Sequence, residues 1–209
     1  NNYVSEKCGV LLFLGSLTAL FLQMQYFRCV FLPASHVLTL TYQSDRTNGV
    51  GFEVRRYDAA KYAAVYSEGR TYEQVIGELV RKLLTYIGGN NEQAMGIAFP
   101  IIITVYPRND GVFSRRLAVG IRIPNAYQQD PPAPTDSTIR VEERPGMTVY
   151  ALYVSFVTVY LIIVGAARLT RALGETTPFQ RKQYFCCSYD PPLKPYGRRN
   201  EVWLLQEDP

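Results

Sequence analysis

The order of the expected secondary-structure elements constrains this chain most, because the same order occurs in both halves. Each half has two strands, one helix and two further strands, as judged from apolar periodicity and turn residues. The first half contains expected strands at 52–57, 61–66, 97–106 and 117–123 and an expected helix over 72–87. The second half contains expected strands at 138–143, 147–154, 182–188 and 201–206 and a helix within 157–173. The repeat predicts an α+β fold: a pseudo-duplicated antiparallel sheet or distorted β-barrel of about eight strands, flanked by two helices.

The first expected helix has start and stop signals of its own. Thr71 and Gln74 fit a capping box, and Gly88 with Gly89 ends the run. Between them, apolar residues recur at helical spacing: Tyr72, Val75, Ile76, Leu79, Val80, Leu83, Tyr86 and Ile87. Their spacing gives one broad apolar face, which predicts a helix that packs on the sheet.

The N-terminal segment differs from the rest of the chain in its hydrophobicity. Residues 9–22 carry no charge, and the apolar stretch continues until Arg28. Its length lies between a signal-peptide core and a spanning helix, so signal peptide, anchor and docking helix all remain open. We expect a hydrophobic N-terminal segment at 1–37, containing a helix, and a folded domain at 38–209. The segment favours a membrane-associated location, in an organelle or the secretory pathway, over a freely cytoplasmic one.

Charge and cysteine patterns exclude several classes of function. The formal net charge is +4, and the basic residues are scattered among acids, so we expect no nucleic-acid partner. The four cysteines show no CxxC and no metal-ligand spacing, and we expect reduced thiols and no metal site. Cys186 and Cys187 are neighbours on an expected strand and should point to opposite faces. No Gly-rich phosphate loop, GxSxG or HExxH occurs, so the chain is predicted not to be an enzyme.

Two long motifs carry a family resemblance. They are YFCCSYDPPLKPYGRRNEVWLL at 184–205 and IRIPNAYQQDPPAPTDSTIRVEERPGMTVY at 121–150. Shorter pieces follow in matching order, including RRYDAAKY at 55–62 and YIGGNN at 86–91. Over about residues 40–209 the chain resembles the heme-binding protein (SOUL) family, and is closest to its heme-binding protein 1 branch.

The resemblance implies non-enzymatic binding of heme or a related tetrapyrrole, as a carrier or buffer, in a shallow apolar groove beside the first helix. Val80 and Leu84 match the family's groove, and Lys194 matches its partner for a propionate. Arg81 and Lys82 lie nearby on the same helix and complete the expected site. Plain core packing remains the alternative for Val80 and Leu84. A flat apolar surface with adjacent cations is what a porphyrin requires.

The chain also departs from the family pattern. Gly77 and Thr85 stand where relatives carry basic residues, so two expected charge contacts are missing. The second expected helix follows an apolar run at 153–167 and lacks a charge until Arg168. Together with residues 9–31, this run predicts contact with a membrane or a protein partner. The alternative function is therefore a structural subunit of a membrane-associated assembly that reuses the SOUL fold, with weak or no heme binding.

Several side chains have both a ligand role and a packing role open to them. The single histidine, His36, lies outside the expected domain, so we expect the ring to be buried without a strong axial bond. Four other side chains could approach a porphyrin: Met95, Met147, Tyr189 and Tyr196.

A charged element at 198–201, RRNE, admits a structural role. We expect Arg198 or Arg199 to pair with Glu201, or with Glu142 and Glu143 on a neighbouring strand.

Overall fold

The computed structural model of the chain describes residues 43–47, 50–88, 95–108, 113–154, 158–190, 194 and 196–207. The hydrophobic segment at 1–37, with the helix expected there, lies outside the described residues, as does His36. No helix of the described part is long and apolar enough to cross a membrane.

The described elements follow the order that the sequence predicts, with one additional strand at the beginning. The strands are β1 (Gln43–Thr47), β2 (Val50–Tyr57), β3 (Ala60–Glu68), β4 (Ile101–Pro107), β5 (Phe113–Arg122), β6 (Arg140–Arg144), β7 (Met147–Val154), β8 (Tyr184–Ser188) and β9 (Asn200–Leu205). The helices are α2 (Tyr72–Gly88), the short 3-10 helix η1 (Asn125–Tyr127) and α3 (Val159–Leu173). The strand expected from residue 97 begins at Ile101, directly after Pro100, which has no N–H to donate to a ladder.

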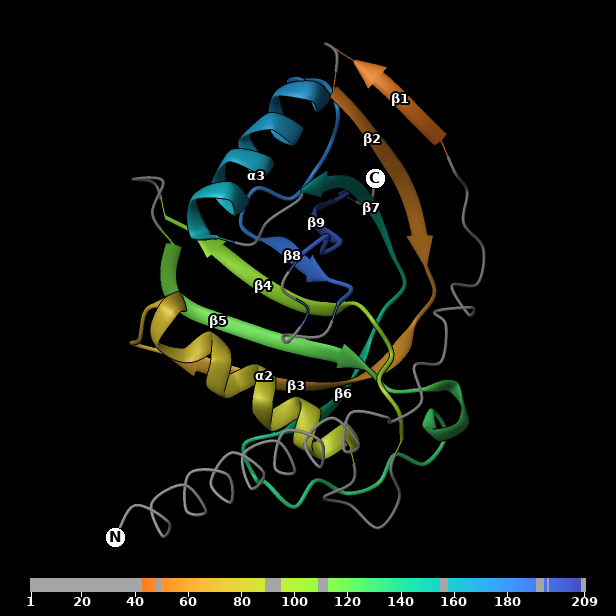
Figure 1. Cartoon of the computed structure of the whole chain (residues 1–209). Coiled ribbons are helices and arrows are strands. Elements are labelled where there is room, and N and C mark those ends of the chain that lie inside the picture. The colour runs from red at the N-terminus through yellow and green to blue at the C-terminus, as the bar shows by residue number, and fades with distance from the viewer. Residues whose placement is uncertain are drawn as a thin grey trace, which may run out of the picture.

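The nine strands of the described residues form one antiparallel sheet with the order β1-β2-β7-β9-β8-β4-β5-β3-β6 (Figure 1). This confirms the α+β prediction of an antiparallel sheet with two helices. The sheet is open, because no pairing among the described residues joins its edge strands β1 and β6. The alternative prediction of a distorted β-barrel is therefore wrong, because the sheet that the structure describes does not close.

The strand order contains the predicted duplication. By element order, β2 corresponds to β6, β3 to β7, β4 to β8 and β5 to β9. If each of these strands is replaced by its counterpart, the sheet order without β1 is obtained in reverse, so every strand keeps the same kind of neighbour. The two halves meet where β4 pairs with β8. The first strand of each half also pairs with a strand of the other half: β2 pairs with β7, and β6 pairs with β3. The repeated element order therefore corresponds to a pseudo-two-fold arrangement.

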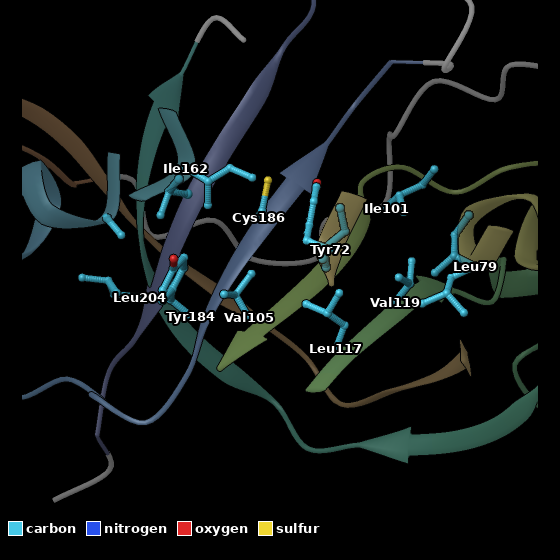
Figure 2. Packing of buried hydrophobic residues seen from close by; sticks show 14 of the residues in the cluster. Tyr72, Leu79, Ile101, Val105, Leu117, Val119, Ile162, Tyr184, Cys186 and Leu204 are labelled. Atoms are coloured by element: carbon cyan, nitrogen blue, oxygen red, sulfur yellow. The ribbon is translucent and has the colours of Figure 1, made fainter. Parts of the chain in front are cut away.

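Both helices cover the same face of the sheet. α2 packs on β3 and β5, and α3 packs on β7 and β9, so the central strands β4 and β8 pass between them (Figure 1). Figure 2 shows the buried layer beneath them, with Leu79 of α2 and Ile162 of α3 among side chains of the central strands. Burial of this apolar layer is the main stabilising term of the fold.

A second buried cluster lies on the other face of the sheet, because successive side chains of a strand alternate between faces. Its centre is Trp203, which is fully buried and stacks on Tyr57 with 4.9 Å between ring centroids. Cys186 belongs to the helix-covered layer and Cys187 to this second cluster, which confirms that they point to opposite faces. Both are free thiols.

The helix α3 lies very close to the sheet. A Cβ added to Gly165 would lie 3.0 Å from Cγ1 of Val154 and 3.1 Å from Cγ2 of Val202. Such distances are shorter than ordinary van der Waals contact, so a methyl group at this position requires Val154 and Val202 to shift by a few tenths of an ångström.

Candidate functional site

The expected apolar contacts lie on one flank of α2. Val80 and Leu84 are half-buried and pack against the edge of the helix-covered core, in a row with Ile76. Residues four apart in a helix stand one above the other, so the three form a continuous apolar strip. The strip is partly packed and partly accessible. Core packing and ligand contact are therefore both compatible with Val80 and Leu84.

Lys82 lies on the opposite flank of α2, about 200° around the helix from Val80. There it lines a groove of about 350 Å³ with the side chains Glu78, Arg81, Thr85, Tyr86, Thr135, Asp136 and Ile139. Its Nζ donates to Oγ1 of Thr138 at 3.1 Å and lies 3.6 Å from a carboxylate oxygen of Asp136. These contacts tie α2 to the segment before β6. The structure does not bring Lys82 together with Val80 and Leu84, whereas Arg81 is exposed between the two flanks.

Lys194 lies in the connection between β8 and β9 and is exposed. Its Nζ donates to Oδ1 of Asp190 at 2.7 Å. Asp190 also accepts a hydrogen bond from the backbone N–H of Arg199. Although burial acts in the opposite direction, these two hydrogen bonds hold the pKa of Asp190 below its usual value. In this state the charge of Lys194 is already paired with an acid.

A buried charge network lies on the other face of the sheet, around Glu201. This carboxylate is 2% exposed and accepts hydrogen bonds from Arg55 at 2.7 and 3.0 Å and from Trp203 Nε1 at 2.8 Å. The hydroxyl of Tyr189 donates to it at 2.8 Å, and Arg199 Nη2 at 2.9 Å. Burial opposes ionisation, but the hydrogen bonds and charge of Arg55 lower the pKa of Glu201. Glu201 is therefore an ionised carboxylate with no free lone pair for a ligand.

This network confirms one sequence prediction and adds a residue that the sequence analysis did not single out. Arg199 pairs with Glu201, as expected for the RRNE element. The main partner is Arg55, which is 146 residues away in the chain. The sequence signal that could have identified Arg55 lies in strand alternation. Residues two apart on a strand share a face, so Arg55 of β2 lies on the same face as Glu53 and Tyr57. Glu142 instead accepts from Arg144 at 2.7 Å and from the hydroxyl of Tyr66.

Three of the four remaining candidate ligands are packed or hydrogen-bonded within the fold. Met95 is buried in the core beneath α2, and Met147 packs against the cluster around Trp203. Tyr189 is engaged with Glu201, while Tyr196 is exposed. Burial raises the pKa of Cys186 to about 12 and that of Cys187 well above its usual value, so neither is a thiolate at neutral pH. The described residues contain no group of three or more His, Cys, Asp or Glu that could hold a metal ion.

Comparison with known proteins gives consistent matches over this same domain. The family model described as SOUL heme-binding protein matches residues 37–205. The chain is 41% identical to heme-binding protein 1 of Bos taurus over 160 residues, which cover 75% of this chain and 84% of that protein. It is 38% identical to heme-binding protein 1 of Xenopus tropicalis, covering 77% and 86%. Heme-binding protein 2 of Homo sapiens is 31% identical, covering 75% and 78%.

Solved structures share the fold at low sequence identity. The C-terminal domain of EcmrR aligns with a TM-score of 0.53 at 9% identity, over 81% of this chain and all of that chain. A structure described as a hydrolase from Listeria innocua aligns with a TM-score of 0.51 at 10% identity, over 79% and 94%. At these identities the alignments support the fold alone.

Proposed function

Because this chain belongs to the SOUL heme-binding protein family, we propose that it binds heme or a related tetrapyrrole without catalysing a reaction on it. The observation that carries the proposal is the family match over residues 37–205, which spans the whole described fold. Relatives named heme-binding protein 1 match over three quarters of the chain, with 38–41% identity. The function follows from this family match and from the site below, since the fold alone does not decide function.

We place the ring on the strip of Ile76, Val80 and Leu84 beside α2. The strip offers an apolar surface that is partly exposed. A porphyrin ring gains free energy by covering such a surface, at about 25 cal/mol for each Å² removed from water. Arg81 and Lys194 supply cations for the propionates. Lys82 faces away from the strip, so its expected contact with the ligand remains a prediction.

Binding of this kind needs no strong axial bond to iron. The described residues include no histidine, and their cysteines are buried and protonated. Free energy then comes from burial of the ring and from the propionates, which suits reversible carriage or buffering.

Contact of residues 9–31 and 153–167 with a membrane or protein partner remains a prediction. Residues 9–31 lie outside the described part of the chain. On α3, Tyr160 is 72% exposed and Ile163 and Val164 are half-buried, so part of the second run faces outward. Flotation of the full chain with liposomes tests the membrane contact. Recovery of all the protein in the bottom fraction as a monomer would contradict it.

Hemin titration followed by the Soret band tests the proposed function. Wild-type protein should shift and sharpen the band at a saturating stoichiometry of one. Val80→Glu should weaken binding at least about tenfold, because a charge in the strip must be desolvated under the ring. Val141→Glu is the matched control, since Val141 is an exposed valine on the edge strand β6, on the side of α2 that Lys82 faces and not on the side of the strip. Absence of any band shift with the wild type would refute the proposal.

A further inference from the structure

Three polar side chains around the beginning of β9 have buried atoms without any hydrogen-bond partner. They are Oδ1 and Nδ2 of Asn200, Oγ of Ser188 and Nε of Arg198. Asn200 is 0% exposed, yet neither atom of its amide is paired. Leaving one buried polar group unpaired costs about 1–3 kcal/mol, and folded proteins contain few such groups. Four such atoms in neighbouring residues therefore call for a missing partner.

The pairing of the strands brings these side chains together. Ser188 lies directly opposite Asn200 in the antiparallel pair of β8 and β9. Residues in this relation have Cβ atoms about 5 Å apart on the same face. Arg198 precedes Asn200 by two residues and shares its face, whereas Arg199 and Glu201 lie on the other. The three side chains thus form one polar row.

This polar row (Ser188, Arg198 and Asn200) lies on the helix-covered face of the sheet. Val202 and Leu204, further along β9 on that face, belong to the core beneath α2 and α3. Apolar residues of the core flank the row within the sheet, because Ser188 pairs with Ile101 of β4 and Asn200 with Val154 of β7. The row is therefore next to β4, which passes between the two helices (Figure 1). Ser188 and Arg198 are only half-buried, so the row opens to the surface beside them.

The chemistry of the row favours an anion over a neutral molecule. Arg198 Nε, Asn200 Nδ2 and Ser188 Oγ are all able to donate hydrogen bonds, and the first carries positive charge. Within the described residues Arg198 has no acid at ion-pair distance, whereas Lys194 is paired with Asp190 and Arg199 with Glu201. A carboxylate accepts several hydrogen bonds and supplies the missing charge, which a water molecule cannot do.

We propose that Ser188, Arg198 and Asn200 form a receptor for one carboxylate of the bound tetrapyrrole. The inference rests on the proposed function and adds to it a site in the sheet, separate from Lys194 on the connecting segment. The ring lies on the strip of α2, and one propionate reaches between the helices to the polar row. The other propionate stays near the surface, within reach of Arg81 or Lys194.

Two metal-free porphyrins that differ only in their carboxylates test this receptor. Protoporphyrin IX carries two free carboxylates, and its dimethyl ester carries none. In fluorescence titrations of the full chain, Asn200→Asp should weaken protoporphyrin IX binding at least about tenfold, because it places a carboxylate against a carboxylate. The same variant should leave the affinity for the dimethyl ester within about twofold.

Two further variants keep the test decisive. Arg198→Leu alters a half-buried residue and should reproduce the selective loss if Asn200→Asp fails to fold, as judged by circular dichroism. Thr104→Val is the control, since Thr104 is also buried but shares its face with Ile102, in the cluster around Trp203. It should change neither affinity.

The outcomes separate the receptor from the proposed function. If the wild type binds neither porphyrin, the proposed function fails and the receptor with it. If the wild type binds both and the variants at Asn200 and Arg198 change neither affinity, or change both equally, the receptor is wrong and the row has a structural role only. A loss confined to protoporphyrin IX supports the receptor.

Discussion

The two halves of the molecule share one architecture and present different surfaces. The first helix, α2, has a half-buried apolar strip on one flank and the charged residues Glu78 and Lys82 on the other. The second helix, α3, occupies the matching place in the other half, begins with apolar residues and leaves Tyr160 72% exposed. The duplicated scaffold fixes where each helix lies, while its outer surface is free to change. The two halves therefore present different chemistry at matching places: an apolar strip and charged residues on α2, and an exposed aromatic ring on α3.

The glycines of the two helices differ in the side of the helix on which they lie. Gly165 of α3 is buried against Val154 and Val202, whereas Gly77 of α2 is exposed, and a Cβ there would meet nothing within 4 Å. A methyl group is therefore crowded at Gly165 and has open space at Gly77. The comparison teaches that the exposed side of α2 can accept substitutions with little effect on the core.

The largest effect is expected where the halves are joined by charge. Arg55→Leu removes the main partner of Glu201 and leaves a buried carboxylate under-compensated, which should destabilise the fold by about 3–5 kcal/mol. Urea unfolding measures the loss. Arg199→Leu is the control: Arg199 is more exposed, and its loss should cost less than about 1 kcal/mol. Equal effects would mean that Arg55 does not hold the halves together.

The same network gives a dependence of stability on pH. The pKa of Glu201 is lower in the folded protein than its ordinary value. The corresponding stabilisation is complete above the pKa of an unfolded glutamate, about 4.3. It is lost as the pH falls through the folded pKa. In Glu201→Gln the free energy of unfolding should fall less steeply below pH 4.3 than in the wild type, as measured by urea unfolding at each pH. Parallel curves would contradict this assignment.

Alanine substitutions at the two helix glycines should have opposite signs. Gly165→Ala forces a methyl group against Val154 and Val202 and should destabilise the protein by about 1–3 kcal/mol. Gly77→Ala sits in open space and should stabilise it by about 0.4–1 kcal/mol, because alanine restricts the unfolded chain. Thermal unfolding of both variants decides the matter. The same sign for both would contradict the distinction between a crowded position at Gly165 and an open one at Gly77.

A smaller effect is expected at the connection between β8 and β9. Asp190→Asn removes the acid paired with Lys194 but keeps an oxygen for the N–H of Arg199. We expect hemin to bind about two- to fivefold more tightly, the range for one exposed ion pair. Soret titration measures this change. Lys194→Ala should weaken binding by a similar factor, and combining it with Asp190→Asn should abolish the gain; a gain that persists would exclude Lys194 as its source.

The smallest effect is expected for Lys82. Lys82→Ala removes contacts with Thr138 and Asp136 on the flank opposite the apolar strip. Hemin affinity should change less than in Lys194→Ala, in the same titration. A larger loss of affinity would indicate that the ligand binds in the groove beside Asp136 and not on the apolar strip.

Local features of this fold were predictable from the sequence. One half of the expected capping box is present, since Oε1 of Gln74 accepts from the backbone N–H of Thr71 at 2.9 Å. The opposite orientation of Cys186 and Cys187 follows from strand geometry alone. β1 was not predicted, because its sequence QSDRT has no apolar alternation and the strand is defined by backbone pairing with β2.

Features that depend on long-range pairing could not be predicted in the same way. Whether the sheet closes depends on the separation of β1 and β6, which no local pattern specifies. The partnership of Arg55 with Glu201 and the unpaired amide of Asn200 likewise depend on register between distant strands. For the site, helical spacing from Val80 is enough to place Lys82 on the opposite side of α2, whereas the contacts of Lys82 with Thr138 and Asp136 depend on the tertiary fold.

The exchange of first strands between the halves has a consequence for synthesis on the ribosome. β2 leaves the ribosome early, but its inner neighbour in the sheet, β7, belongs to the second half, and the strand beyond that is β9. A nascent first half therefore cannot complete its own sheet, and one edge of β2 stays unpaired until β7 has been synthesised. Such non-local topologies fold slowly and depend on protection from aggregation during that interval.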